Sequence, residues 1–246
     1  MRKVFPLPAI PRDLQEAISG SSFSPSLRLS VSPSPRSPSL YFSGLLVILF
    51  SVASCDKPSR IAKYPDGTLR VRYEQATTHS TCLVAGVAMA CNYLLGESRF
   101  TEQRIRGDLK RSGGDETRVS DLKAYLAKTP EKLWMLTLTG GLNDQPPAGL
   151  GYWLNRRGYP AICVINRDPG GDSGFNHAVV VIGFCANPKG ESADIMVHYL
   201  DPSSVEPLHS AKAGVFEGLW ARGGHAMILV VAPPTGPQDD RDKEMR

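Results

Sequence analysis

Four apolar runs in the second half of the chain constrain its fold more than any other feature. Each run is rich in β-branched residues and is bounded by Gly, Pro, Asn or Asp. Branched side chains pack well on a pleated surface, so runs of this kind are typical of β-strands. We therefore predict an antiparallel sheet that contains AICVIN (161–166), HAVVVIGFC (177–185), IMVHYL (195–200) and AMILVV (226–231). The run LWMLTLT, which begins at Leu133, is also strand-like.

Helical patterns dominate the chain before these runs. From Cys82 to Leu95 the apolar residues recur at intervals of three and four, which predicts a mostly buried helix that ends at Gly96. Weaker patterns predict helices at about 101–111 and 119–128 and a short helix over 148–157. A helical N-terminal part and a strand-rich C-terminal part indicate an α+β fold, in which the Cys82 helix packs on the antiparallel β-sheet and the two parts face each other across a cleft.

The first 54 residues differ in composition from the rest of the chain. Residues 19–40 are rich in Ser and Pro and show no periodicity that would bury a face. Residues 41–53 are uncharged and mostly apolar, too short for the ~20 residues of a membrane-spanning helix but suited to the apolar region of a signal peptide. Val52-Ala53-Ser54-Cys55 then resembles the lipobox of bacterial lipoproteins, which implies cleavage before Cys55 and acylation of its thiol. An ordinary secretory signal and a short buried helix are the alternatives.

These features divide the chain into four parts. Residues 1–54 form a signal region with a Ser/Pro-rich extension, and residues 55–72 carry the lipidated cysteine and a polar tether. Residues 73–232 form one globular domain without internal repeats, and residues 233–246 form a polar, disordered tail. The formal net charge of +4 is spread along the chain without a basic stripe interleaved with aromatic residues, so we expect no nucleic-acid partner.

Three residues supply the elements of thiol chemistry. A thiol becomes a strong nucleophile when it is ionised, and a helix N-terminus together with an imidazolium neighbour lowers the pKa of a thiol. Cys82 opens the predicted helix and is the predicted nucleophile, whereas His177 opens the longest apolar strand and is the predicted base. A base of this kind needs a group that fixes its other ring nitrogen. Asp201, at the end of the run 195–200, is predicted for this role, with Asn176 as the alternative.

The remaining histidines are assigned no catalytic role. His79 is interpreted as a solvated loop residue, although its position near Cys82 would also let it assist or replace the base. His198 is interpreted as an ordinary strand residue, and His209 and His225 as loop residues. Because the chain contains no HExxH, cysteine pair or other metal-ligand spacing, we expect neither a metal nor another cofactor.

Three cysteines remain after this assignment. With Cys55 given to the lipid and Cys82 to catalysis, Cys91, Cys163 and Cys185 form an odd set that cannot all pair within the chain. A disulfide between Cys163 and Cys185 is an option in an oxidising periplasm, since both lie on strand-like runs. We favour the interpretation that all three are small buried thiols.

The same stretches resemble the successive motifs of a known family. Residues 75–96, LNRRGYPAICVIN, NHAVVVIGF, HYLDPSS and AGVFEGLW are similar to motifs of the papain-like, bacteriocin-processing cysteine peptidases that cleave double-glycine leaders. The likeness covers about residues 75–232 and keeps the family's order of cysteine, histidine and aspartate. It implies a papain-like fold in which Gln75 lines the oxyanion hole together with the Cys82 backbone N–H. It also implies the roles already assigned to Cys82, His177 and Asp201.

The expected function is therefore that of a membrane-anchored, extracytoplasmic thiol peptidase, which hydrolyses a peptide bond through an acyl-enzyme on Cys82. The expected partners are a peptide or protein substrate and the bacterial cell membrane, bound through lipid on Cys55 with the domain facing the periplasm or the exterior; an export machinery is a further option. The chain departs from the family pattern beside the nucleophile, where Leu83-Val84 follows in place of Gly-Pro. Two alternatives stay open: an inactive papain-like lipoprotein that binds peptides or serves in assembly, and a thiol-dependent acyltransferase.

Overall fold

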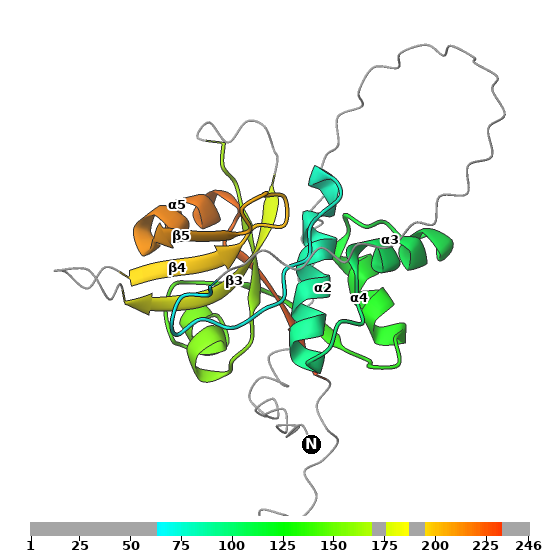
Figure 1. The fold of residues 1–246 in the computed structure, drawn as a ribbon, viewed down its shortest axis with the longest axis horizontal. Coiled ribbons are helices and arrows are strands. Elements are labelled where there is room, and N and C mark those ends of the chain that lie inside the picture. Colours follow the sequence, from blue (N-terminus) through cyan, green and yellow to red (C-terminus); the bar gives the residue numbers. More distant parts are fainter. Residues whose placement is uncertain (1–62, 169–175, 187–194, 233–246) are drawn as a thin grey trace, which may run out of the picture.

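A six-stranded antiparallel sheet forms the centre of the molecule (Figure 1). The structure is a computed structural model that describes residues 63–168, 176–186 and 195–232. The strand order is β1-β6-β2-β3-β4-β5, and every neighbouring pair is antiparallel. The strands are β1 (Trp134–Thr139), β2 (Ala161–Ile165), β3 (His177–Ala186), β4 (Ile195–Leu200), β5 (Leu208–Lys212) and β6 (Ala226–Val231).

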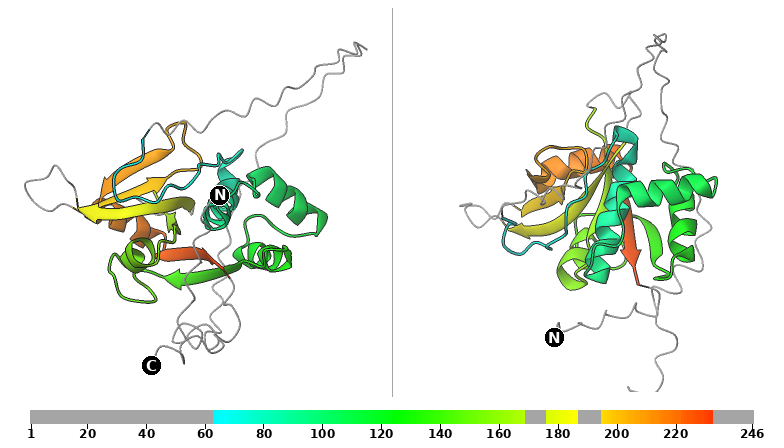
Figure 2. Two further views of the ribbon diagram at one scale, coloured as in Figure 1. Left: turned by 60° about the horizontal axis from the view of Figure 1, so that its bottom comes forward. Right: turned by 45° about the vertical axis from the view of Figure 1, so that its right-hand side comes forward.

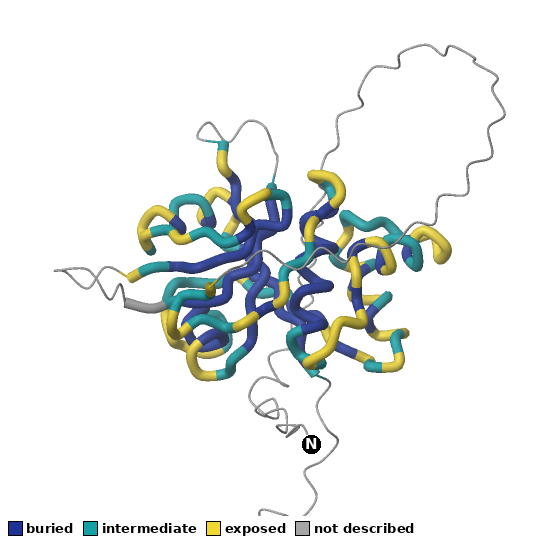
Figure 3. The backbone as a smooth tube through the Cα atoms, in the orientation of Figure 1, coloured by how far each residue is buried: buried dark blue, intermediate teal, exposed yellow. Residues whose placement is uncertain are grey.

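The central strands are apolar along their whole length because both faces of the sheet are covered. Successive residues of a strand point to opposite faces, and in β2 Ile162 packs in the cluster with α2 (Cys82–Leu95) whereas Cys163 packs in the cluster with α5 (Ala213–Arg222). Figure 3 shows the result, with α2 and the middle of the sheet buried and the exposed residues confined to the periphery. The predicted α+β class, with the Cys82 helix packed on an antiparallel sheet, is confirmed.

Helix α2 begins and ends where the sequence predicts. It follows a short 3-10 turn, η1 (His79–Thr81), in which Thr78 and Thr81 form a reciprocal capping box. Every residue from Cys82 to Asn92 is buried, since α2 lies between the sheet and the other helices. Gly96 ends the helix in the left-handed conformation (φ 67°), which glycine adopts at little cost, and its N–H bonds to the Tyr93 carbonyl.

Helices α3 (Glu102–Arg111) and α4 (Val119–Lys128) match the predicted helices and lie on the side of α2 away from β4 and β5 (Figure 2). The buried Asn92 side chain links α2 to the segment before α3, because it accepts from the Phe100 and Arg99 backbone N–H groups and donates to the Phe100 carbonyl. A buried amide with these partners satisfied fixes the position of the neighbouring segment. The start of α3 is thereby held close to α2.

Three elements differ from the prediction. The short helix expected over 148–157 is a π-helical turn, η2 (Tyr152–Arg156). Strand β5 and helix α5 were not predicted, and His209, expected in a loop, lies in β5. Strand β5 is an edge strand in which two of the five residues are exposed and none is buried, so it lacks an apolar run. Helix α5 contains two glycines but is held by the fully buried Phe216 and Trp220.

The folded part also begins earlier than the expected boundary at residue 73. The Leu69 N–H bonds to the Ile182 carbonyl of β3 at 2.7 Å, and Val71 is fully buried. Thr68 lies so close to Gly183 that a β-carbon added at Gly183 would be 2.5 Å from the Thr68 side chain. Part of the predicted tether therefore packs on the sheet. The signal region, Cys55 and the predicted tail at 233–246 lie outside the described residues, and no helix within the described ranges is long and apolar enough to cross a membrane.

The cysteines of the core are free thiols. Cys91 and Cys163 are fully buried, and desolvation raises the pKa of each well above the usual range of a thiol. The register places Cys163 opposite Val179, six positions before Cys185 on β3. The option of a Cys163–Cys185 disulfide is therefore wrong, and the interpretation of Cys91 and Cys163 as small buried thiols is confirmed.

Candidate active site

The nucleophile predicted from the sequence is the first residue of α2. The helix N-terminus at Cys82 directs the positive end of the helix dipole towards the thiol. The backbone N–H of Ala178, on β3, donates to Cys82 Sγ at 3.4 Å. Residues that lie 96 positions apart in the sequence thus meet where α2 crosses the start of β3.

His177 lies between this thiol and a carboxylate. It is the first residue of β3, and its Nε2 is 2.7 Å from Asp201 Oδ1. Asp201 directly follows β4, and because β3 and β4 are antiparallel, the start of β3 and the end of β4 meet at the same edge of the sheet. The Cys82 side chain interacts with His177 as well and, like Asp201, raises the pKa of His177.

Asp201 is held by more groups than the sequence predicts. Its Oδ2 accepts from Arg167 Nη2 at 2.5 Å, and its Oδ1 also accepts from the Ser203 backbone N–H at 2.9 Å. Asp201 is 1% exposed, so these bonds compensate the burial of its charge. The sequence analysis did not predict Arg167 as a site residue. The feature that could have indicated Arg167 is its position two residues after β2, because the last residue of β2, Ile165, pairs with His177.

The charges of this group stabilise one another. Burial opposes ionisation of both His177 and Asp201 and is the largest single influence on each pKa, but the hydrogen bonds and charges of their partners together more than offset it. For His177, burial alone would lower the pKa, whereas the hydrogen bonds and charges of Asp201 and Cys82 raise it from 6.5 to about 9. For Asp201, burial would raise the pKa, whereas His177, the Ser203 N–H and Arg167 hold it well below its usual range. The imidazole is thus held as an imidazolium at neutral pH.

The thiol and the imidazole are more enclosed than the sequence predicts. The sequence predicts a cleft between the two parts of the domain, but Cys82 is 1% and His177 5% exposed. The cause is the close packing of α2 on β3, which brings the Ala178 N–H onto the thiol. A hollow of about 610 Å³ adjoins the imidazole, and its walls include His177, Asp201 and Arg167.

The other candidate residues lie in loops, in η1 and in β4. Gln75 is exposed in the segment before η1, and its role in an oxyanion hole stays a prediction. Asn176 is half-buried, and Asp201 rather than Asn176 holds the imidazole. His79 lies in η1 and lines the hollow, whereas His198 lies in β4, where its Nδ1 contacts Ser210 Oγ. Within the described ranges no group of three or more His, Cys, Asp or Glu side chains could hold a metal ion.

Fold and site together define an α+β domain with a thiol, an imidazole and a carboxylate in contact at the N-terminus of a buried helix. Among solved structures, the chain is similar to the peptidase domain of Streptococcus ComA, a bi-functional ABC transporter involved in a quorum-sensing pathway. The two share 16% sequence identity with a TM-score of 0.44, over 65% of this chain and 98% of the ComA domain. No protein-family model and no curated protein matches this chain.

Proposed function

We propose that this chain is a cysteine peptidase that hydrolyses a peptide bond through an acyl-enzyme on Cys82. The observation that carries the proposal is the position of His177, which interacts with Cys82 and has its Nε2 2.7 Å from Asp201 Oδ1. A thiol, a base and a group that orients the base are the elements that nucleophilic acyl transfer requires. The order of these residues and the motifs around them, which resemble bacteriocin-processing peptidases, support the same activity.

In the proposed reaction, Cys82 Sγ attacks the carbonyl carbon of the substrate as a thiolate, and the carbonyl oxygen becomes an oxyanion. When this intermediate collapses, the carbon–nitrogen bond breaks and the His177 imidazolium gives its proton to the departing amine. A water molecule then loses a proton to His177 while its oxygen attacks the thioester, and the carbon–sulfur bond breaks to return the thiolate. One water is consumed, and no cofactor takes part.

The surrounding residues have supporting roles in this proposal. Asp201 fixes the ring orientation of His177 and favours the imidazolium, and Arg167 keeps Asp201 charged and in place. The hollow beside His177 is the proposed site of the leaving segment, because the proton donor forms part of its wall. Gln75 and the Cys82 backbone N–H are the proposed donors to the oxyanion.

We also propose that the domain acts outside the cytoplasm, anchored to a bacterial membrane through lipid on Cys55. The support for this step is the sequence alone, in which an apolar stretch at 41–53 ends in Val52-Ala53-Ser54-Cys55. A lipid-anchored peptidase would meet peptides at the membrane surface. A double-glycine leader is the substrate class that the family resemblance favours.

The test is selective modification of Cys82 by iodoacetamide, a reagent small enough for an enclosed thiol, followed by peptide mapping. We expect rapid labelling of Cys82 and its loss in His177→Ala. Cys91 and Cys163 are internal controls, because burial raises their pKa and keeps them unreactive. Equal labelling of all three thiols, or no labelling, would favour the peptide-binding alternative. With a peptide substrate and an added amine, transfer of the acyl group from Cys82 to the amine, with no free acid formed, would favour the acyltransferase.

A further inference from the structure

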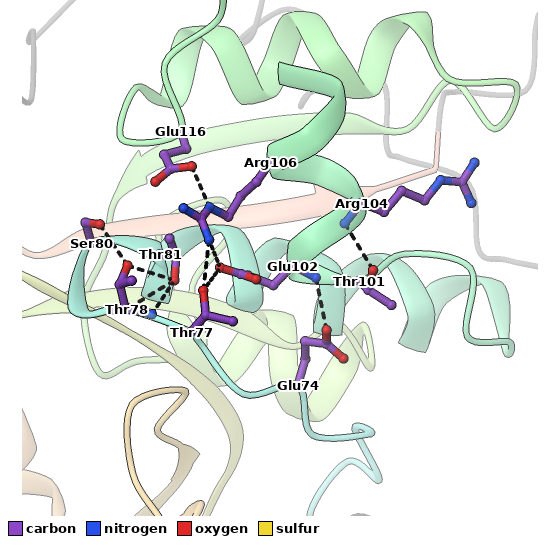
Figure 4. A network of polar contacts seen from close by, with 10 residues as sticks. All are labelled: Glu74, Thr77, Thr78, Ser80, Thr81, Thr101, Glu102, Arg104, Arg106 and Glu116. Carbon is purple, nitrogen blue, oxygen red and sulfur yellow. Dashed lines mark hydrogen bonds and ion pairs between the residues drawn. The ribbon is translucent and has the colours of Figure 1, made fainter. Parts of the chain in front are cut away.

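A polar network joins the first turn of α3 to the segment that leads into the nucleophile helix (Figure 4). The Thr77 hydroxyl donates to Glu102 Oε1 at 2.7 Å and accepts from Arg106 Nη1 at 2.9 Å. Arg106 Nη1 also lies 3.1 Å from Glu102 Oε1, so the three side chains contact one another in a closed triangle. We call Thr77, Glu102 and Arg106 the α3 clamp.

The Glu102 side chain of the α3 clamp is buried in the interior of the domain. Glu102 is 1% exposed, and its Oε2 is buried without a hydrogen-bond partner among the described residues. A buried carboxylate is costly unless it is paired, so the bonds of its Oε1 to Thr77 and Arg106 are what keep it there. Arg106 is in turn held by Glu116, with Nε 2.7 Å from Glu116 Oε2.

Both neighbours of Gln75 are fixed as well. The Glu74 carboxylate accepts from the Glu102 backbone N–H at 3.0 Å, at the N-terminus of α3. The Ala76 backbone N–H donates to the Pro202 carbonyl at 2.9 Å, next to Asp201. Residues 74, 76 and 77 are therefore tied to the fold, while Gln75 between them is exposed. A backbone held on both sides of an exposed polar side chain is the arrangement that a preorganised donor needs.

We propose that the α3 clamp is a positioning device that holds Gln75 at the oxyanion of the acyl-transfer reaction. Thr77, Glu102 and Arg106 act only through Gln75 and do not touch the substrate. This inference rests on the proposed function, in which Gln75 is a donor to the oxyanion. Misplacement of a catalytic group by about 1 Å can cost ~10²-fold in rate, so loss of a single clamp contact has a measurable effect.

Two reagents separate the oxyanion donor from the nucleophile without a known substrate. p-Nitrophenyl acetate acylates a thiolate through an oxyanion: the sulfur–acyl bond forms, and p-nitrophenolate leaves with the electron pair of its ester bond. Iodoacetamide alkylates the same thiolate by displacing iodide and forms no oxyanion. The ratio of the two second-order rate constants at Cys82 therefore reports on the oxyanion donors alone.

Thr77→Val is the central variant, because valine is similar in size to threonine but lacks the hydroxyl. Thr77 is exposed, so the substitution leaves the core intact. We expect acylation of Cys82 to slow by about ten-fold or more, with alkylation unchanged. Thr77→Ser, which keeps the hydroxyl, restores acylation. Thr139→Val, at an exposed threonine of the edge strand β1, is the matched control and leaves both rates unchanged.

A double-mutant cycle with Gln75 completes the test. Gln75→Ala slows acylation by up to ~10²-fold, and adding Thr77→Val to it has no further effect, because the α3 clamp acts through Gln75. A further loss in the double variant, an equal loss of both rates in Thr77→Val, or no loss of acylation would overturn the inference. A wild-type protein in which neither reagent modifies Cys82 would overturn the proposed function and the inference with it.

Discussion

Replacement of Asp201 by Asn removes the charge that holds the central imidazole. Asp201 Oδ1 accepts from His177 Nε2 at 2.7 Å, and an asparagine keeps the shape of the side chain but not its charge. Burial then opposes the imidazolium with only Cys82 left to favour it, so the pKa of His177 falls. The imidazolium donates the proton to the leaving amine in the proposed reaction. As the pH rises, the variant therefore loses activity at a lower pH than the wild type.

The size of the effect follows from the pKa of His177. It is raised from 6.5 to about 9, and one pKa unit corresponds to ~1.4 kcal/mol, so burial and its partners together favour the imidazolium by a net of about 3 kcal/mol. Asp201 and Cys82 both contribute, and we expect Asp201→Asn to move the alkaline limb of kcat/KM down by about one pH unit or more. In the wild type the stabilisation from the raised pKa of His177 is fully present below pH 6.5 and is lost as the pH rises through about 9. The stabilisation from the lowered pKa of Asp201 is present above pH 3.8 and is lost as the pH falls below that value.

The assay is the pH profile of kcat/KM for a fluorogenic double-glycine peptide amide, whose leaving amine requires a proton. The wild type should keep its activity through neutral pH and lose it near pH 9. Asp108→Asn, which removes a carboxylate on α3 that contacts Tyr125, is the control and should leave the profile unchanged. A wild-type limb near pH 6.5, or the same limb in wild type and Asp201→Asn, would refute the reasoning.

The remaining predictions concern the nucleophile, the anchor and the core. Cys82→Ala should abolish thioester formation and lower the unfolding free energy by less than about 2 kcal/mol, measured by urea unfolding, since only one sulfur atom is lost. Cys55→Ser should release the protein from bacterial membranes or leave it unprocessed, and unchanged fractionation and mass would exclude the anchor. Gly223→Ala should destabilise by about 1–3 kcal/mol, because a β-carbon there meets the Val164 carbonyl oxygen at 2.0 Å, whereas Gly218→Ala within α5 should be neutral or stabilising.

The sequence predicts the sheet and the three central site residues for a simple reason. Strands β2, β3, β4 and β6 are covered on both faces, so their apolar runs are long and their ends are marked by turn residues. His177 and Asp201 stand at two of these ends, and antiparallel pairing brings such ends together. The start of α2 is equally clear, because Cys82 opens the apolar helical pattern.

The other features of the site depend on contacts between residues far apart in the sequence, which no local sequence pattern predicts. Arg167 reaches Asp201 across 34 positions of sequence, and Thr77 reaches Glu102 across 25. Charged residues at loop and helix starts are usually solvated, so nothing nearby in the sequence marks Glu102 as a buried carboxylate. The burial of Cys82 and His177 has the same origin, because it arises where α2 packs on β3 and not from either segment alone.

The central claim is that Cys82 carries the acyl group during the reaction. The most direct measurement is peptide mapping by mass spectrometry after brief treatment of the full chain with p-nitrophenyl acetate. We predict one acetyl thioester, located on Cys82, released by hydroxylamine and absent in Cys82→Ala and His177→Ala. An acetyl group found only on other residues, or the same Cys82 modification without His177, would contradict the account.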